Sequence, residues 1–285
     1  MVPQNYIVQE LLDLARDTLR ASSDSVGLDT QVWLAHVLET DRAWILAHTD
    51  EKVSPEKGKA FINGVDQMAA GRPLPYLLGK WEFYGFSYLI NESVLIPRPE
   101  TELLVDQALN WLKHTTAPIR MADVGTGSGC IGISIANLRS DLAVTAIDIS
   151  SQALNIARQN IEKHKLEDRV YLIEGDLLEN TQGKFDLICA NLPYIPSEHL
   201  ERLEVVKAEP RIALDGGNDG MELLRRCLIQ AKDRITADSC ILAEIDPSYA
   251  KEIEEFAQAN FPQSTCNVLM DLAGRERLLR ITHEE

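Results

Sequence analysis

The sequence predicts an α/β protein, with a mostly parallel sheet that carries helices on both faces, preceded by a small helical bundle and a connecting β-hairpin. From residue 119 onward, short apolar runs alternate with apolar residues at helical spacing. This alternation is typical of parallel strands joined by right-handed crossovers. A glycine-rich stretch at residues 125–129 connects the first of these runs to a helical pattern. Residues 1–73 show helical periodicity, so we expect them to form a separate helical domain.

The helical domain is expected to contain short helices. Its apolar residues fall into three sets at helical spacing, which begin at Tyr6, Val32 and Phe61. Breaks rich in polar residues, glycine or proline separate these sets and end the domain; they lie at residues 22–24, 48–55 and 71–75.

A linker and β-hairpin at residues 74–98 are expected to join this domain to an α/β domain at residues 99–285. Residues 81–96 are rich in aromatic and β-branched side chains, a composition that favours strands. Pro99 suits the first turn of a helix, where Glu100 and Glu102 interact favourably with the helix dipole.

The first strand of the α/β domain is predicted at residues 119–124, and the stretch Gly125-Thr126-Gly127-Ser128-Gly129 follows it. Glycines let the backbone approach a ligand closely, and a helix N-terminus presents free N–H groups to an anionic group. Strand, glycine loop and helix in this order suit a nucleotide-like ligand. A dinucleotide site is an alternative, because glycines at 127, 129 and 132 fit G-x-G-x-x-G, but that motif starts two residues late relative to the strand end.

Acidic residues mark the ends of the next two predicted strands. Asp148 ends the run at residues 143–147, and Asp176 follows the run at residues 170–173. Asp148 is placed to accept hydrogen bonds from both hydroxyls of a ribose, and Asp176 from an adenine amino group. Either residue alone is more often a helix cap. Their serial order at successive strand ends favours a ligand site.

The stretch Asn191-Leu192-Pro193-Tyr194 follows a fourth apolar run at residues 185–190 and therefore faces the ligand crevice. Asn191 offers an acceptor oxygen, Leu192 offers a backbone carbonyl, and Pro193 makes the turn rigid. Such a turn suits a planar –NH2 group, whose two hydrogens find two acceptors while the Tyr194 ring covers one face. The alternative is an ordinary turn in which Asn191 acts as a cap.

The remaining strands are expected at residues 240–246, 268–270 and 277–281, and helices at residues 221–229 and 249–256. A final hairpin makes the last strand antiparallel to the others.

Composition narrows the function. The net charge of −16 argues against a polyanion as the main partner, because affinity for nucleic acid comes largely from phosphate neutralisation. The five cysteines show no C-x-x-C spacing, so we predict neither a metal site nor a disulfide framework. Residues 1–10 lack a signal-peptide pattern and no 18-residue apolar stretch occurs. We expect a reduced, cytoplasmic protein.

The order of these motifs resembles the class I S-adenosylmethionine-dependent methyltransferases that act on exocyclic or amide nitrogens. Three further stretches resemble one family within that class, the release factor glutamine methyltransferases. They are Val94-Leu95-Ile96-Pro97-Arg98-Pro99-Glu100-Thr101-Glu102, Glu209-Pro210-Arg211-Ile212-Ala213-Leu214 with its following glycines, and Asp271-Leu272-Ala273-Gly274-Arg275. The resemblance implies a Rossmann-like, mostly parallel sheet of seven strands.

The resemblance also implies a role for each candidate residue. S-adenosyl-L-methionine, which becomes S-adenosyl-L-homocysteine, would contact Gly125, Thr126, Gly127, Ser128 and Gly129 through its methionyl end, Asp148 through its ribose, Asp176 and Leu177 through its adenine, and Asn191. The catalytic set would be Asn191, Leu192, Pro193 and Tyr194, which hold and enclose the substrate amide. In the family the helix after Pro99 covers the cofactor, so Arg98 and Glu100 are further contact candidates.

Two positions depart from the family's usual pattern. Leu192 replaces the first proline of Asn-Pro-Pro-Tyr, and since a backbone carbonyl acts there, we expect function to be retained with a looser turn. Leu177 stands where some relatives carry an aromatic residue, so we expect aliphatic packing against the adenine.

The activity implied by the resemblance is transfer of a methyl group to the glutamine N5 of the Gly-Gly-Gln motif in class I peptide chain release factors, which tunes translation termination. Residues 1–73 are then the candidate for recognition of the release factor. We expect a monomer with no direct nucleic-acid or membrane partner. Three alternatives stay open from the sequence: N5-glutamine methylation of a ribosomal protein, N6-adenine methylation of nucleic acid, and a binding module without activity.

Overall fold

The computed structural model describes residues 6–20, 25–116, 118–203 and 205–283. The chain divides into two compact units, of which the first ends at Gly79 and the second begins at Lys80. The described residues contain no helix that is both long enough and apolar enough to cross a membrane.

The first unit is helical, as expected. Within its described residues the helices are α1 (Val8–Leu19), α2 (Val26–Leu38), α3 (Arg42–Ala47), α4 (Pro55–Ala69) and α5 (Leu74–Leu78), with a short antiparallel pair of β1 (Tyr6–Ile7) and β2 (Lys52–Val53). Ser54 caps α4, with Pro55 at the first helical position. Leu74 joins the core of this unit, which is why the unit extends beyond residue 73. The predicted break at residues 22–24 lies outside the described residues.

One contact fixes how closely α2 and α4 approach each other. The Trp33 side chain of α2 donates from Nε1 to the Phe61 carbonyl oxygen over 2.9 Å. Its ring lies against Gly64 of α4, where an added Cβ would be 2.2 Å from a ring carbon. A side chain at residue 64 would therefore push the two helices apart.

The second unit begins with a β-hairpin of β3 (Lys80–Phe83) and β4 (Phe86–Leu89). Tyr84 and Gly85 form its turn with φ values of 51° and 74°, as a two-residue turn between twisted strands requires. Residues 94–96 read as an extended continuation of this pattern, but residues 90–98 contain no strand. They run instead along the ligand pocket described below.

The sheet of the second unit contains seven strands in the described part of the chain, in the order β10-β11-β9-β8-β5-β6-β7. The strands are β5 (Ile119–Val124), β6 (Leu142–Asp148), β7 (Val170–Glu174), β8 (Phe185–Ala190), β9 (Ile235–Glu244), β10 (Thr265–Met270) and β11 (Glu276–His283). β11 runs antiparallel to both neighbours, and the pairings among β5 to β9 are parallel. The predicted mostly parallel seven-stranded sheet is confirmed.

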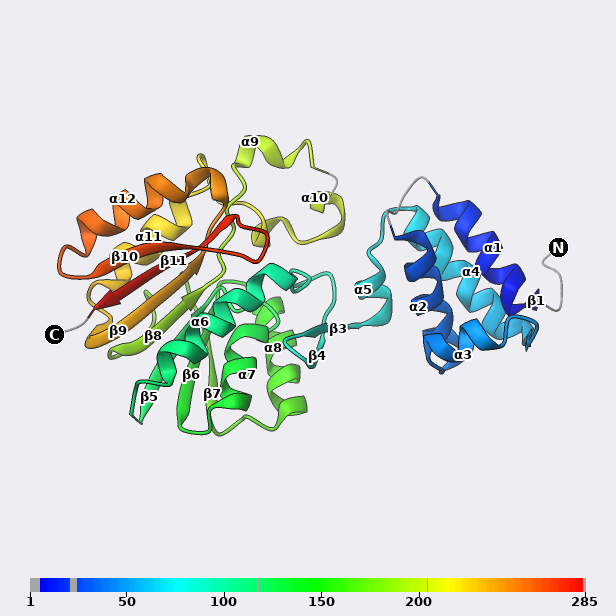
Figure 1. The fold of residues 1–285 in the computed structure, drawn as a ribbon, viewed down its shortest axis with the longest axis horizontal. Helices are drawn as coiled ribbons and strands as arrows, with labels where there is room; N and C mark the ends of the chain where they lie inside the picture. The colour runs from blue at the N-terminus through cyan, green and yellow to red at the C-terminus, as the bar shows by residue number, and fades with distance from the viewer. Residues whose placement is uncertain (1–5, 21–24, 117, 204, 284–285) are drawn as a thin grey trace. The chain divides into compact units, whose positions relative to one another are not determined.

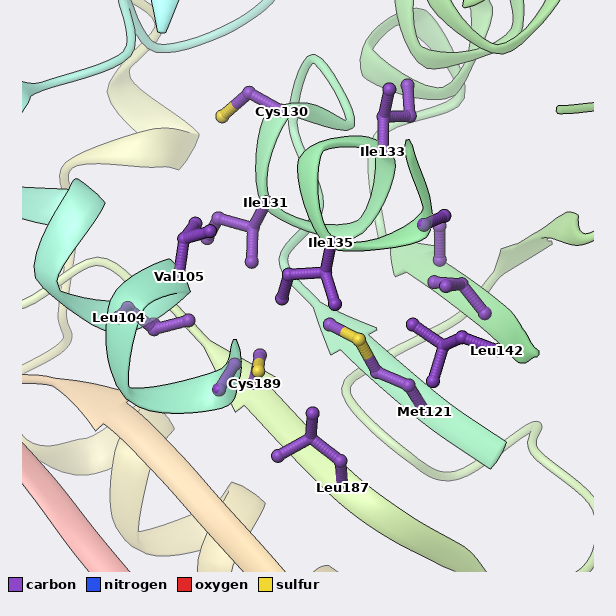
Figure 2. Close-up of a cluster of buried hydrophobic side chains, with 14 of the residues drawn as sticks. Leu104, Val105, Met121, Cys130, Ile131, Ile133, Ile135, Leu142, Leu187 and Cys189 are labelled. Atoms are coloured by element: carbon purple, nitrogen blue, oxygen red, sulfur yellow. The ribbon is translucent and has the colours of Figure 1, made fainter. Parts of the chain in front are cut away.

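Helices cover both faces of this sheet (Figure 1). One apolar layer contains side chains of α6 (Glu102–Leu112), α7 (Cys130–Leu138) and α8 (Ser151–His164), and the other contains those of α11 (Glu222–Ala231) and α12 (Ala250–Asn260). Figure 2 shows α6 and α7 side chains meeting those of β5 and β8 in the first layer. Strands covered on both faces carry few polar residues, and most residues of β5, β6 and β8 are buried, which explains why these strands are visible in the sequence. β7 ends the strand order, and its Tyr171 is exposed.

Among the residues that the structure describes, five short helical segments lie in the connections of the second unit. They are η1 (Pro99–Thr101), which precedes α6, then α9 (Ser197–Leu200), α10 (Val205–Ala208) and η2 (Arg211–Ala213) between β8 and α11, and η3 (Pro247–Tyr249) before α12. The parallel register places Val124 beside Ile147 and Ala190, and Ala190 beside Ala243. The residues that follow β5, β6, β7, β8 and β9 therefore lie together at the carboxyl-terminal end of the parallel strands.

Candidate active site

A pocket of about 590 Å³ opens at the carboxyl-terminal end of the parallel strands, and all its lining residues belong to the second unit. Ten of the predicted site residues line it: Gly125, Thr126, Gly127, Ser128, Asp148, Asp176, Leu177, Asn191, Leu192 and Pro193. Tyr194 lines an adjoining pocket of about 150 Å³ that shares Asn191, Leu192 and Pro193 with the first. Gly129 is instead the N-cap of α7.

The glycine loop has the backbone that its composition predicts. Gly125, Gly127 and Gly129 have φ values of 70°, 56° and 83°, which side chains other than hydrogen disfavour. Space is also restricted, because a Cβ on Gly129 would lie 2.8 Å from Ile133 Cδ1 and one on Gly125 would lie 3.0 Å from Leu192 Cδ2. Leu192 therefore packs directly against the loop.

A buried carboxylate supports the loop from below. Asp123 Oδ2 accepts hydrogen bonds from Thr126 Oγ1 at 2.6 Å and from Gly132 N at 3.0 Å. Its Oδ1 has no hydrogen-bond partner among the described residues. Burial raises the pKa of Asp123 to about 6. The sequence placed Asp123 in the strand before the loop without a role, and its support of the loop required the structure.

Asp148 holds its own turn and faces the pocket at once. Its Oδ2 accepts from Gly127 N and its Oδ1 accepts from Ser150 N, both at 2.9 Å. Burial raises the pKa of Asp148, and these backbone donors lower it. Each carboxylate oxygen has more than one acceptor position, so both can also take a hydrogen bond from a ligand hydroxyl. The cap and the ligand interpretations are compatible.

Asp176 has a cationic partner that the sequence did not indicate. Arg226 of α11 lies 2.5 Å from Asp176 Oδ2 through NH2, and both residues line the pocket. The next residue, Leu177, has a φ of 56°, which is rare for a side chain of this size. Gln230 of α11 accepts from Leu178 N at 2.7 Å. Helix α11 thus holds the turn after β7 through two side chains, Arg226 and Gln230.

Asn191 is tied to two residues outside the predicted set. Its Nδ2 donates to Thr101 Oγ1 at 3.0 Å, and Thr101 Oγ1 donates to Glu244 Oε2 at 2.6 Å. Thr101 is 3% exposed and Glu244 is 4% exposed. The Pro-Arg-Pro-Glu-Thr-Glu stretch signalled the neighbourhood of Thr101 but not this contact. Glu244 ends β9, where the sequence predicted a strand without assigning it a function.

A second ion pair includes the pocket residue Arg98. Glu209 is nearly buried, pairs with Arg98 and accepts from Ile96 N at 3.0 Å. This pair joins the segment before η1 to the Glu-Pro-Arg stretch that leads to η2. Arg98 and Arg211 both line the pocket, whereas Glu100 is exposed and does not.

The Asn191–Tyr194 turn is enclosed from behind by a glycine-containing loop. A Cβ on Gly216 would lie 2.7 Å from Tyr194 Cα, and one on Gly220 would lie 2.5 Å from the Tyr194 carbonyl oxygen. Burial raises the pKa of Tyr194 to about 12. The phenol is therefore neutral and cannot act as a base at neutral pH.

One buried carboxamide links the glycine loop to the β-hairpin. Asn160 of α8 is fully buried, and its Nδ2 donates to the carbonyl oxygens of Ser128 at 2.8 Å and Leu89 at 2.9 Å. Its Oδ1 accepts from Leu89 N at 2.7 Å. These three hydrogen bonds join the glycine loop to the end of β4, two segments that are far apart in sequence.

Comparison with known proteins supplies the family. The "Methyltransferase small domain" model matches residues 101–208, and the "PrmC N-terminal domain" model matches residues 10–79. The release factor glutamine methyltransferase of Rhodopirellula baltica is 36% identical over 96% of this chain and 95% of its own. The chain belongs to the release factor glutamine methyltransferase family. The family member of Bordetella pertussis is 39% identical over 88% of this chain and 93% of its own.

Solved structures agree with the fold of this family member. A methyltransferase from Pyrococcus furiosus has a TM-score of 0.52 and 17% identity over 71% of this chain and 91% of its own. A ribosomal protein L11 methylase from Lactobacillus delbrueckii subsp. bulgaricus has a TM-score of 0.50 and 24% identity over 69% of this chain and 84% of its own. At these identities the likeness concerns the class I methyltransferase fold alone.

Proposed function

We propose that this methyltransferase transfers the methyl group of S-adenosyl-L-methionine to the N5 atom of a glutamine in a class I release factor, within the Gly-Gly-Gln motif. The observation that carries the proposal is the orientation of Asn191. Its Nδ2 is used by Thr101, so its Oδ1 is left to accept a hydrogen bond from a planar amide. An acceptor at the junction of a large pocket and a small one suits an –NH2 group that meets a methyl donor.

The larger pocket fits S-adenosyl-L-methionine by its chemistry. A volume of about 590 Å³ falls in the range of small-molecule sites. Asp148 can accept from the ribose hydroxyls, and the turn at Asp176 and Leu177 can contact the adenine. The glycine loop brings backbone N–H groups to the methionyl end. When bound, the cofactor supplies an electrophilic methyl group on a sulfonium.

The smaller pocket is proposed to take the glutamine side chain. An amide nitrogen is a weak nucleophile because its lone pair is delocalised into the carbonyl, so orientation and exclusion of water must carry much of the catalysis. Asn191 Oδ1 and the Leu192 carbonyl oxygen accept the two amide hydrogens, while Pro193 and Tyr194 wall the slot. The nitrogen–methyl bond forms as the sulfur–methyl bond breaks. A proton then leaves the nitrogen to solvent, since Tyr194 is no base.

Transfer of labelled methyl groups tests this proposal. Purified enzyme and labelled S-adenosyl-L-methionine are incubated with a full-length release factor, ribosomal protein L11 and DNA. We expect label in the release factor alone, located by mass spectrometry on the motif glutamine, and none in a release factor with that glutamine changed to alanine. Label in L11 or DNA but in no release factor would overturn the proposal.

A further inference from the structure

A buried polar chain connects three elements behind the catalytic turn. Asn191 follows β8, Thr101 ends η1, and Glu244 ends β9. The two hydrogen bonds that join them measure 3.0 Å and 2.6 Å. Because Thr101 and Glu244 are almost fully buried, water has little access to replace either bond.

The hydroxyl of Thr101 determines which group donates and which accepts in these two hydrogen bonds. A hydroxyl has one hydrogen, and an ionised carboxylate can only accept. The Thr101 hydrogen therefore goes to Glu244, and Thr101 Oγ1 can only accept from Asn191. Asn191 must then turn its –NH2 toward Thr101 and its Oδ1 away from it. The orientation of an amide is normally assigned from its surroundings, and here the charge of Glu244 decides it.

The groups around Glu244 act in both directions on its ionisation. Burial raises the pKa of Glu244, whereas the Thr101 hydrogen bond and the cations of Arg277 and Arg98 lower it, and Glu100 raises it. Tyr194, whose neutral ring is also near Glu244, adds no charge. The two arginines thus oppose the rise in the pKa of Glu244 that burial causes, and Glu100 adds to that rise.

We propose that Thr101 and Glu244 are positioning residues that fix the acceptor oxygen of Asn191 toward the substrate amide. This inference rests on the proposed function. A turned Asn191 would present an –NH2 group to the –NH2 group of glutamine, and two donors cannot pair. In the fixed orientation, a glutamate side chain is disfavoured because its carboxylate oxygens would meet Asn191 Oδ1. The hydrogen-bonded residues Asn191, Thr101 and Glu244 therefore select an amide over a carboxylate and hold it for methyl transfer.

A measurement without any protein substrate tests the orientation itself. In the NMR spectrum of the full-length enzyme, we expect one Asn191 side-chain amide hydrogen to exchange slowly with solvent because it is donated to Thr101. Thr101→Val removes the hydroxyl at nearly constant shape and should abolish this slow exchange, whereas Thr101→Ser should keep it. Equal exchange in the valine and serine variants would overturn the proposal, whatever the substrate of the enzyme is.

Kinetics test the consequence for catalysis. Loss of one positioned hydrogen-bonding group can cost about a hundredfold in turnover, so we expect Thr101→Val to reduce turnover at least about tenfold, because Asn191 still visits the active orientation. Affinity for S-adenosyl-L-methionine should stay within about threefold, and Thr101→Ser should restore most of the turnover. A parallel fall in cofactor affinity and turnover would show that Thr101 is only a pocket wall.

Glu244→Gln keeps the shape of the side chain and serves as a second variant if Thr101→Val fails to fold. Glutamine can turn either its oxygen or its –NH2 toward Thr101, so both Asn191 orientations become allowed and turnover should fall by a few-fold. In the wild type, protonation of Glu244 reverses the direction of both hydrogen bonds, because the carboxylic acid donates to Thr101 and Thr101 then donates to Asn191. Turnover should thus fall as pH drops through the raised pKa of Glu244, and the Glu244→Gln enzyme should lose this acid limb. An unchanged pH profile would overturn the proposal. If the wild type labels no release factor, the proposed function fails while the amide exchange still decides the orientation.

Discussion

At the scale of single residues, Asp148 holds its own turn, and we propose that the same carboxylate also binds the cofactor ribose. Asp148→Ala would remove two charge-assisted hydrogen bonds to the ribose, worth about 1.5–3 kcal/mol each, so the affinity for S-adenosyl-L-methionine should fall by about tenfold to several hundredfold. Calorimetric titration measures this loss. Asp141→Ala is a control, since Asp141 pairs with Arg139 and does not line the pocket. Wild-type affinity in a folded Asp148→Ala enzyme would remove this residue from the cofactor site.

The proposed catalytic role of the Asn191–Tyr194 turn predicts opposite effects of two substitutions on turnover. Asn191→Ala should lower turnover at least about a hundredfold, because one of two acceptors for the amide is lost, with a smaller effect on cofactor affinity. Leu192→Pro should keep turnover, since the backbone carbonyl remains. It should lower stability by about 1–3 kcal/mol, because the buried Leu192 side chain packs on Gly125. Steady-state kinetics and thermal unfolding separate these outcomes, and an inactive Leu192→Pro enzyme would contradict the assigned role of the carbonyl.

At the scale of elements, the contact between α2 and α4 predicts a local defect. Gly64→Ala places a Cβ against the Trp33 ring and should destabilise the helical unit by about 1–3 kcal/mol. Gly27→Ala is the matched control, because a Cβ on Gly27 of α2 meets no atom within 4 Å. That variant should be slightly stabilising. Thermal unfolding followed by tryptophan fluorescence compares the two variants, and equal stability would show that the helices separate without cost.

The sequence indicated the elements whose residues carry local signals. Parallel strands such as β5 and β8 are mostly apolar, and the glycine loop and Asp148 lie at the carboxyl ends of strands, so this end of the sheet could be predicted. The start of β9 was missed because Ala237 and Asp238 are exposed and the polar residues Thr236, Asp238 and Ser239 interrupt the apolar run. Arg226 and Glu244 were missed as site residues for another reason. Their roles depend on Asp176 and Thr101, which are 50 and 143 residues away, and no local pattern records such pairs.

At the scale of the whole molecule, the division at Gly79 and Lys80 separates the helical unit, which we propose recognises the release factor, from the unit that carries the pocket. All residues that line the pocket belong to the second unit, so we expect residues 80–285 to retain affinity for S-adenosyl-L-methionine. The same fragment should methylate a full-length release factor at least about tenfold less efficiently, because the remote binding energy of the helical unit is lost. A short Gly-Gly-Gln peptide should be a poor substrate for both proteins. Equal rates on the full-length factor would show that the helical unit plays no part in recognition.

The buried Asn160 side chain makes the β-hairpin and the glycine loop thermodynamically linked. A ligand that steadies the loop at Ser128 must also steady Leu89, and any partner that steadies the hairpin must tighten the ligand by the same factor, because coupling free energies are reciprocal. Hydrogen exchange should therefore slow at the Leu89 amide when the cofactor binds, and this response should vanish in Asn160→Ala. If the response survived that substitution, the linkage would run through other contacts. With this linkage, a protein docked near the hairpin would change the affinity of the enzyme for its cofactor without touching the pocket.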